Sequence, residues 1–305
     1  MKTPDTATEV RRLLSRYARS RNEDFQLVLI NYALERLLYR ISRSAHSTKF
    51  VLKGAMLFRL WTNQPHRATR DLDLLGWGNS DASALEATFK DICLVNVEDD
   101  GLIFLPETVK ATEIRETQEY GGIRIIMEVH LQKARIPVQV DVGFGDAITP
   151  AAVNITFPTL LEFSPPMLLA YPRETVVAEK LEAIVKLGMI NSRMKDFYDL
   201  YVISRIFSFD RNVLATAINA TFKRRETLLP AEVPVAFTPE FYFDKLKMQQ
   251  WAGFQNKLTI LDTPQDLDAI VLRIHDFLMP CIQAIAENST GEIVWVGDHW
   301  LQPTP

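Results

Sequence analysis

The chain contains few of the residues from which disulfide frameworks and zinc sites are built. Its 305 residues include only two cysteines, Cys93 and Cys281, and five histidines. The cysteines lie far apart in apolar or mixed surroundings, and the histidines lack the spacing of a zinc site. The pattern excludes a disulfide-stapled scaffold and indicates two buried thiols in a protein of a reducing compartment, the cytoplasm.

Long apolar runs and an excess of basic charge are also missing. No apolar run reaches the length of a membrane span, and the N-terminal segment lacks the apolar core of a secretory signal, so we expect no membrane association. The formal net charge of −4 gives no global basic field, although a local basic surface stays open. The arginines near the N-terminus and "FKRRE" at 222–226 either contact phosphates or form solvated basic faces.

The order of periodic segments predicts three regions. Residues 1–45 carry apolar residues at helical spacing, residues 46–165 mix strand and helix patterns, and residues 166–305 are mainly helical. A mixed segment between helical ones argues against a doubly wound parallel sheet. The sequence therefore predicts an α+β fold: N-terminal helices, a mixed sheet with flanking helices, and a C-terminal helical domain.

Two aspartates, Asp71 and Asp73, stand one residue apart in the apolar stretch "TRDLDLLGW". Residues i and i+2 of a strand point to the same face, so both carboxylates would lie side by side, where like charges repel. A divalent cation between them would remove that repulsion, and Mg²⁺ is usually held by one or two carboxylates together with substrate phosphates. The other interpretation is a strand end with two solvated aspartates.

The context of this pair favours the metal interpretation. In "FVLKGAMLFRLW" a buried strand runs into Gly54 and Ala55 before an apolar helix, and a glycine at such a turn lets backbone N–H groups approach phosphates. A glycine turn followed by D-x-D is the layout of the nucleotidyltransferase fold shared with DNA polymerase beta. That fold places a third carboxylate on a neighbouring strand. Asp141 in "IPVQVDVGFGD" is our candidate, and Asp146 is the alternative.

A second polar cluster is expected in the helical region. Lys180 lies in "VVAEKLEAIV", and Lys195, Asp196 and Asp199 lie in "RMKDFYDLYVI". Asp196 and Asp199 are three residues apart, and Lys195 and Asp199 four apart, so each pair shares a helix face. Surface ion pairs of little energetic value are the simpler interpretation. The aromatic residues between them are typical of a buried helix. This favours charged side chains that contact a specific partner group over side chains that are merely solvated.

Together these segments resemble the AbiEii/AbiGii toxin family of nucleotidyltransferase-like proteins, over roughly residues 10–210. The resemblance is carried by "FVLKGAMLFRLW", "TRDLDLL", "ETVVAEKLEAIVKLGM" and "SRMKDFYDLY", the last being similar to the K-D-x-x-D motif of the family. One departure concerns the phosphate turn. Many members have Gly-Ser or Gly-Gly where this chain has Gly54-Ala55, which removes one possible phosphate contact.

The resemblance implies a polymerase-beta-like core and a bacterial toxin of a toxin–antitoxin or phage-defence operon. Such a toxin would transfer nucleotides from an NTP to an acceptor, with tRNA 3′ ends the acceptor in some members, and an antitoxin encoded by a neighbouring gene would restrain it. Two alternatives stay open. In the first, the acceptor is a small molecule or a protein side chain. In the second, the site is degenerate and serves only to bind nucleotide or a partner protein.

The resemblance also implies roles for the acidic and basic residues. Asp71 and Asp73 would hold two Mg²⁺ (or Mn²⁺) ions, and Asp141 would hold the ion that activates the nucleophile. Lys180, a catalytic candidate, and Lys195 would neutralise the β- and γ-phosphates and the departing pyrophosphate.

The other candidate substrate-binding residues surround these groups. Gly54 and Ala55 form the phosphate turn, Arg70 flanks the carboxylates, and Asp196 and Asp199 would orient the lysines or contact the base or ribose. A last candidate, Thr69, lies two residues before Asp71 and shares its face. It is either an ordinary β-branched strand residue or a regulatory position at which a phosphate would block the site.

Overall fold

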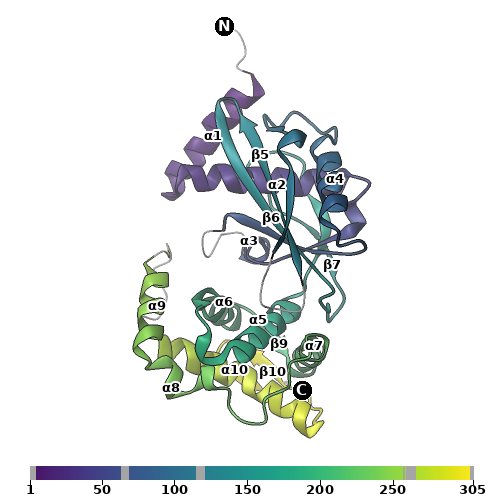
Figure 1. The fold of residues 1–305 in the computed structure, drawn as a ribbon. Coiled ribbons are helices and arrows are strands. Elements are labelled where there is room, and N and C mark those ends of the chain that lie inside the picture. The colour runs from purple at the N-terminus through teal and green to yellow at the C-terminus, as the bar shows by residue number, and fades with distance from the viewer. Residues whose placement is uncertain (1–4, 63–68, 115–120, 257, 259–265, 303–305) are drawn as a thin grey trace. The chain divides into compact units, whose positions relative to one another are not determined.

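We describe the protein from a computed structural model, which describes residues 5–62, 69–114, 121–256, 258 and 266–302. The chain divides into two compact units. The first, here the sheet unit, comprises Met1–Gly145 and Val153–Tyr171, and the second, the helical unit, comprises Asp146–Ala152 and Pro172–Pro305. Figure 1 draws the sheet unit mainly in purple to teal and the helical unit in green to yellow.

The sheet unit contains the following elements. Its helices are α1 (Thr6–Arg21), α2 (Phe25–Arg43), α3 (Met56–Thr62) and α4 (Ala82–Cys93), with 3₁₀ turns at Ser47–Lys49 and Pro106–Thr108. Its strands are β1 (Phe50–Lys53), β2 (Asp71–Gly76), β3 (Ile103–Phe104), β4 (Lys110–Ile114), β5 (Gly122–Leu131), β6 (Ala134–Phe144), β7 (Val153–Thr156) and β8 (Met167–Ala170).

The strands form one mixed sheet in the order β3-β5-β6-β2-β1-β8-β7, with β4 paired to β5. Strands β5 and β6 form a long antiparallel hairpin, whereas β2 lies parallel to β6 and antiparallel to β1. This mixed sheet with flanking helices confirms the predicted α+β class. The hairpin turns at Gln132, which has a φ of 55°.

Buried and half-buried residues alternate along the central strands, so one face of the sheet forms the core and the other does not. Leu72 and Leu74 of β2, with Val140 and Val142 of β6, are fully buried, and α2 packs against β6 and β8. Successive side chains of a strand point to opposite faces. The aspartates between these residues therefore share the other face, which is only half-buried.

Helix α2 is tied to the segment before β3 by buried charges. Its residues Arg36 and Arg40 are 0% and 5% exposed, and both donate hydrogen bonds to the carboxylate of Asp100, which is itself 1% exposed. A buried charge is tolerated only when it is paired and hydrogen-bonded. The pairing therefore fixes this segment on α2.

The helical unit is built mainly of helices. Its elements are α5 (Arg173–Leu187), α6 (Met194–Ile206), α7 (Arg211–Arg224), α8 (Pro239–Tyr242), α9 (Lys245–Gln255) and α10 (Leu267–Glu287), with 3₁₀ turns at Gly188–Ile190 and Val235–Phe237. A small sheet that the sequence pattern did not predict pairs β9 (Phe209–Asp210), β10 (Val294–Val296) and β11 (His299–Leu301).

The expectation that no segment is apolar enough to span a membrane needs correction for α10. This helix has 21 residues and a window of mean hydropathy 1.4, so it meets the length and composition of a span. Half of that window is buried inside the unit, where the helix packs against α6 and α7. That packing accounts for its apolar composition.

Glu35 of α2 is a buried acid with an incomplete set of partners. Its side chain is fully buried, and Oε2 accepts hydrogen bonds from the backbone N–H of Leu160 (2.7 Å) and from Arg59 (3.2 Å). Among the described residues Oε1 has no hydrogen-bond partner. Burial raises the pKa of Glu35 to about 7, although Arg59 opposes the rise.

We predict that Glu35 makes the stability of the protein fall as pH rises. An acid whose pKa is raised from 4.5 to about 7 on folding stabilises the protein fully below the lower value and loses that contribution as pH passes the higher one. The loss is at most about 3 kcal/mol. Urea unfolding of wild type and Glu35→Gln between about pH 5 and pH 8 measures it. Glu35→Gln should give the flatter curve, and parallel curves would contradict the prediction.

Candidate functional site

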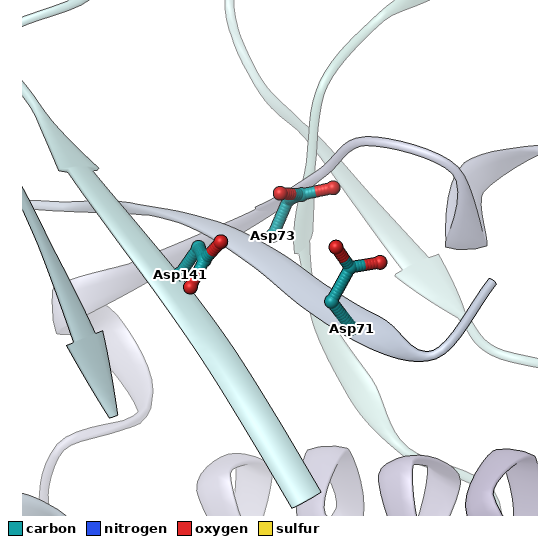
Figure 2. A group of neighbouring side chains, drawn as sticks. All are labelled: Asp71, Asp73 and Asp141. Atoms are coloured by element: carbon teal, nitrogen blue, oxygen red, sulfur yellow. The ribbon is translucent and has the colours of Figure 1, made fainter. Parts of the chain in front are cut away.

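Three carboxylates meet on the half-buried face of the sheet. Asp71 and Asp73 lie on β2, and the parallel register of β2 and β6 places Asp141 directly beside Asp73. Each residue offers a carboxylate oxygen, and these three oxygens lie within 4.8 Å of one another. Figure 2 shows the three side chains gathered on one side of the two strands. We call this group the carboxylate triad.

Neighbouring side chains hold two members of the triad in place. Arg124 of β5 lies opposite Asp141 and donates through Nε and Nη2 to its two oxygens, each at 2.8 Å. The amide of Gln139 lies 3.3 Å from the same oxygens. The Thr69 hydroxyl donates to Asp71 Oδ1 at 2.9 Å. Arg124 pairs with one of the three carboxylates, and the closeness of the three acidic groups favours a cation.

Gly54 makes room for the second aspartate. It follows β1 with a φ of 75°, and a Cβ added there would lie 1.9 Å from Asp73 Oδ2. Any other residue would therefore displace the carboxylate or the turn, and the positive φ adds a further penalty. The structure thus gives Gly54 a role beside Asp73 that differs from the expected phosphate contact. Whether its N–H groups also meet phosphate stays a prediction.

The other predicted residues near the triad lie in different surroundings. Ala55 continues the turn into α3 and is half-buried, whereas Arg70 is exposed immediately before β2. Thr69 is half-buried beside Asp71, so its proposed regulatory role stays a prediction. The alternative third carboxylate, Asp146, does not join the triad. Its carboxylate accepts hydrogen bonds from Arg225 within the helical unit.

Sequence reasoning missed three residues of the triad face. Arg124 and Gln139 contact Asp141, and Lys53 of β1 lies directly opposite Asp73 in the antiparallel register. Directly opposed residues of an antiparallel pair project to the same face. The step from apolar Leu52 to charged Lys53 at the end of the strand pattern was a signal that could have placed Lys53 on this face.

Lys180 lies at the centre of the predicted second cluster, within the helical unit. Its Nζ lies 2.8 Å from both Asp196 Oδ1 and Asp199 Oδ2, and Arg193 Nε lies 2.7 Å from the other Asp196 oxygen. Asp196 and Asp199 are buried, so these are not the surface ion pairs of the simpler interpretation. Lys195 is exposed.

The charges of this cluster are mutually dependent. Burial works to raise the pKa of the Asp196 carboxyl, but Lys180 and Arg193 outweigh it and hold the pKa below its ordinary value. Asp196 therefore depends on Lys180 and Arg193 to stay charged inside the unit. Both aspartates contact Lys180, and whether they orient it for the reaction stays a prediction.

The sequence predicted a carboxylate triad on a mixed sheet beside a glycine turn, and the structure has this arrangement. The model of a family described as nucleotidyl transferase AbiEii toxin, type IV toxin–antitoxin system, matches residues 36–273. This match spans more than half of the chain. The protein therefore belongs to the AbiEii family of nucleotidyltransferase toxins, as the sequence motifs predicted.

Two crystal structures are similar to the chain. One is a proposed nucleotidyltransferase from H. pylori, with 14% identity and a TM-score of 0.48, covering 87% of this chain and 98% of that one. The other is JHP933 from Helicobacter pylori, with 15% identity and a TM-score of 0.47, covering 85% of this chain and 93% of that one. No curated protein matches the chain.

We predict that Gly54→Ala disables the triad. The new Cβ would overlap Asp73 Oδ2, so the carboxylate has to move and the response to divalent cations should be lost. The measurement is the rise in melting temperature that Mg²⁺ or Mn²⁺ produces in the wild type and in the variant.

Gly78→Ala is the matched control for this substitution. Gly78 also has a positive φ, of 99°, but an added Cβ would meet nothing within 4 Å. Both variants carry the backbone penalty of about 1 kcal/mol, and only Gly54→Ala adds the overlap. Equal cation responses in the two variants would show that the space beside Asp73 is unimportant.

Proposed function

We propose that the protein transfers a nucleotide from an NTP to the 3′ end of an RNA, with tRNA as the acceptor, and that the transfer depends on Mg²⁺ or Mn²⁺. The observation that carries this proposal is the triad, whose three ligand oxygens lie within 4.8 Å of one another. The family establishes the class of the protein, a nucleotidyltransferase toxin. The acceptor and the metal are our inference.

The donor set of the triad fits divalent cations. Mg²⁺ prefers oxygen ligands at about 2.0–2.1 Å, and paired ions in phosphoryl-transfer sites lie about 3.5–4 Å apart. Carboxylate oxygens within 4.8 Å of one another suit both requirements. Asp71, Asp73 and Asp141 would hold the ions. When bound, such ions polarise the α-phosphate, lower the pKa of the attacking hydroxyl and neutralise the leaving pyrophosphate.

The reaction balances without any further reactant. The 3′ hydroxyl oxygen of the RNA forms a bond to the α-phosphorus, the bond between the α-phosphorus and the bridging oxygen to the β-phosphate breaks, and pyrophosphate leaves. The hydroxyl proton passes to solvent. The residues around the triad position its members for this step: Thr69 holds Asp71, Gly54 leaves space for Asp73, and Arg124 orients Asp141.

We assign the phosphate-neutralising role to Lys180, with Arg70 and Lys195 as further cations. Asp196 and Asp199 hold the Lys180 ammonium in one position through two contacts of 2.8 Å, so little reorganisation is needed when phosphate charge arrives. A triad with all three carboxylates together also argues against a degenerate site that binds nucleotide without using it.

The biological setting follows from the family. Type IV toxin–antitoxin membership implies a cognate antitoxin, which we expect to be encoded by the neighbouring gene. Modification of tRNA ends in the cytoplasm would stop translation and arrest growth, for example during phage infection.

We predict that Asp71→Asn with Asp73→Asn abolishes transfer and leaves the fold intact. The exchange removes two like charges that repel each other, so the melting temperature without metal should not fall. Incubation with α-labelled NTPs, Mg²⁺ and total RNA should label a tRNA-sized band with the wild type only. The matched control is Asp91→Asn on α4, whose side chain is 70% exposed.

Two outcomes would contradict this proposal. A double variant with wild-type labelling would remove the triad from the chemistry. Label that appears on protein or on a small molecule, with RNA unlabelled, would replace the RNA acceptor by one of the alternatives.

We predict that Lys180→Met slows NTP use by about 2–4 kcal/mol in transition-state terms, the range for one preorganised charge-stabilising donor. The change also takes the Lys180 ammonium away from buried Asp196 and Asp199, which destabilises the unit. A second variant, Lys180→Met with Asp196→Asn and Asp199→Asn, also removes the two buried negative charges that Lys180 compensates. Restored melting temperature without restored kcat/KM is the expected result. Restored activity would show that Lys180 is only structural.

A further inference from the structure

Helix α1 carries a stripe of arginines that the proposed chemistry does not use. Arg12, Arg16 and Arg19 are exposed, and at 100° per residue they fall within an arc of about 60° on the helix. The buried residues Val10 and Leu14 lie on the opposite side. The helix lies before residues 36–273, the part of the chain that the family model matches.

The stripe has more basic than acidic groups. Glu9 pairs with Arg12 and lies in the electrostatic range of Arg16. In the part of the chain that the structure describes, no hydrogen bond or ion pair is found for Arg16 or Arg19. Such a concentration of positive charge is unexpected for packing alone in a protein with a net charge of −4, and it suits a polyanion.

The stripe lies at a distance from the triad within the same unit. The N-terminal turn of α1 contacts the tip of the β5–β6 hairpin, where the Gln132 amide donates to the Thr8 hydroxyl. From the start of β6 at Ala134 to Asp141 the strand rises seven residues, or about 23 Å. A mononucleotide or small acceptor at the triad would not reach the start of α1, whereas a polynucleotide would.

We propose that the arginine stripe, defined as Arg12, Arg16 and Arg19, binds the phosphate backbone of the RNA acceptor while its 3′ end lies at the triad. This inference rests on the proposed function and deepens it, because it assigns the acceptor a length and a second contact. The three arginines span about 10 Å along the helix axis, enough to meet successive phosphates of one strand.

The test compares wild type with Arg12→Gln/Arg16→Gln/Arg19→Gln in the full chain. Glutamine has nearly the helix propensity of arginine, so α1 should be kept, which circular dichroism checks. Fluorescence anisotropy with a labelled tRNA transcript at several salt concentrations measures the phosphate contacts. Each lost contact lowers the slope of log Kd against log salt by about 0.7–0.9, so we expect the loss of three contacts to decrease it by about 2–3.

The kinetics separate binding of the acceptor from chemistry at the triad. In the triple variant the KM for tRNA should rise, while the KM for NTP and the kcat at saturating tRNA should stay as in wild type. With a trinucleotide acceptor, which is too short to span both places, wild type and variant should transfer equally well.

Two further variants serve as controls. Lys110→Gln/Lys186→Gln/Lys245→Gln removes the same net charge from three exposed lysines elsewhere and should leave the salt slope nearly unchanged. Glu9→Gln removes the acidic partner of Arg12 and should tighten RNA binding.

The outcomes distinguish this inference from the proposed function. If the wild type transfers no nucleotide but the triple variant still loses the salt dependence of RNA binding, the proposed function is refuted. The inference that the stripe binds RNA would then stand. A salt slope equal to that of the lysine control would overturn the inference. So would stripe-dependent binding to phosphatidylserine vesicles without stripe-dependent binding to RNA.

Discussion

The repulsion among three carboxylates on one face of a sheet is the constraint on which the rest of the site depends. Asp71, Asp73 and Asp141 offer oxygens within 4.8 Å of one another, and the sheet unit contains the features that make this possible. Arg124 offsets one charge through two hydrogen bonds, and Gly54 leaves out the one atom that would collide with Asp73. A divalent cation held between the carboxylates would relieve this repulsion.

The register of the strands is what brings these aspartates together on one face. Because β2 and β6 are parallel and in register, the aspartates of both strands fall on one face, while leucines and valines fall on the other and form the core with α2. A slip of one residue would reverse both faces. The same alternation therefore builds the core and the triad, which couples the stability of the sheet to the geometry of the site.

Much of this site was predictable from the sequence, and the limits have physical causes. The D-x-D spacing and the strand pattern around Asp141 are local signals. Arg124 was not predictable, because its place opposite Asp141 depends on the register of a hairpin whose turn contains Gln132 at positive φ, without the usual glycine or asparagine. The short strands β10 and β11 were missed because three residues carry little periodicity. Burial of Asp196 and Asp199 depends on packing that no spacing rule reveals.

The central claim is that the triad is a metal centre for nucleotidyl transfer. The most direct measurement is a crystal structure with Mn²⁺ and a non-hydrolysable NTP analogue, with data recorded at the Mn absorption edge. The account predicts anomalous peaks within bonding distance of Asp71, Asp73 and Asp141, with the α-phosphate beside them and Gly54 unmoved. Manganese peaks found elsewhere, with the nucleotide bound away from the triad, would contradict it.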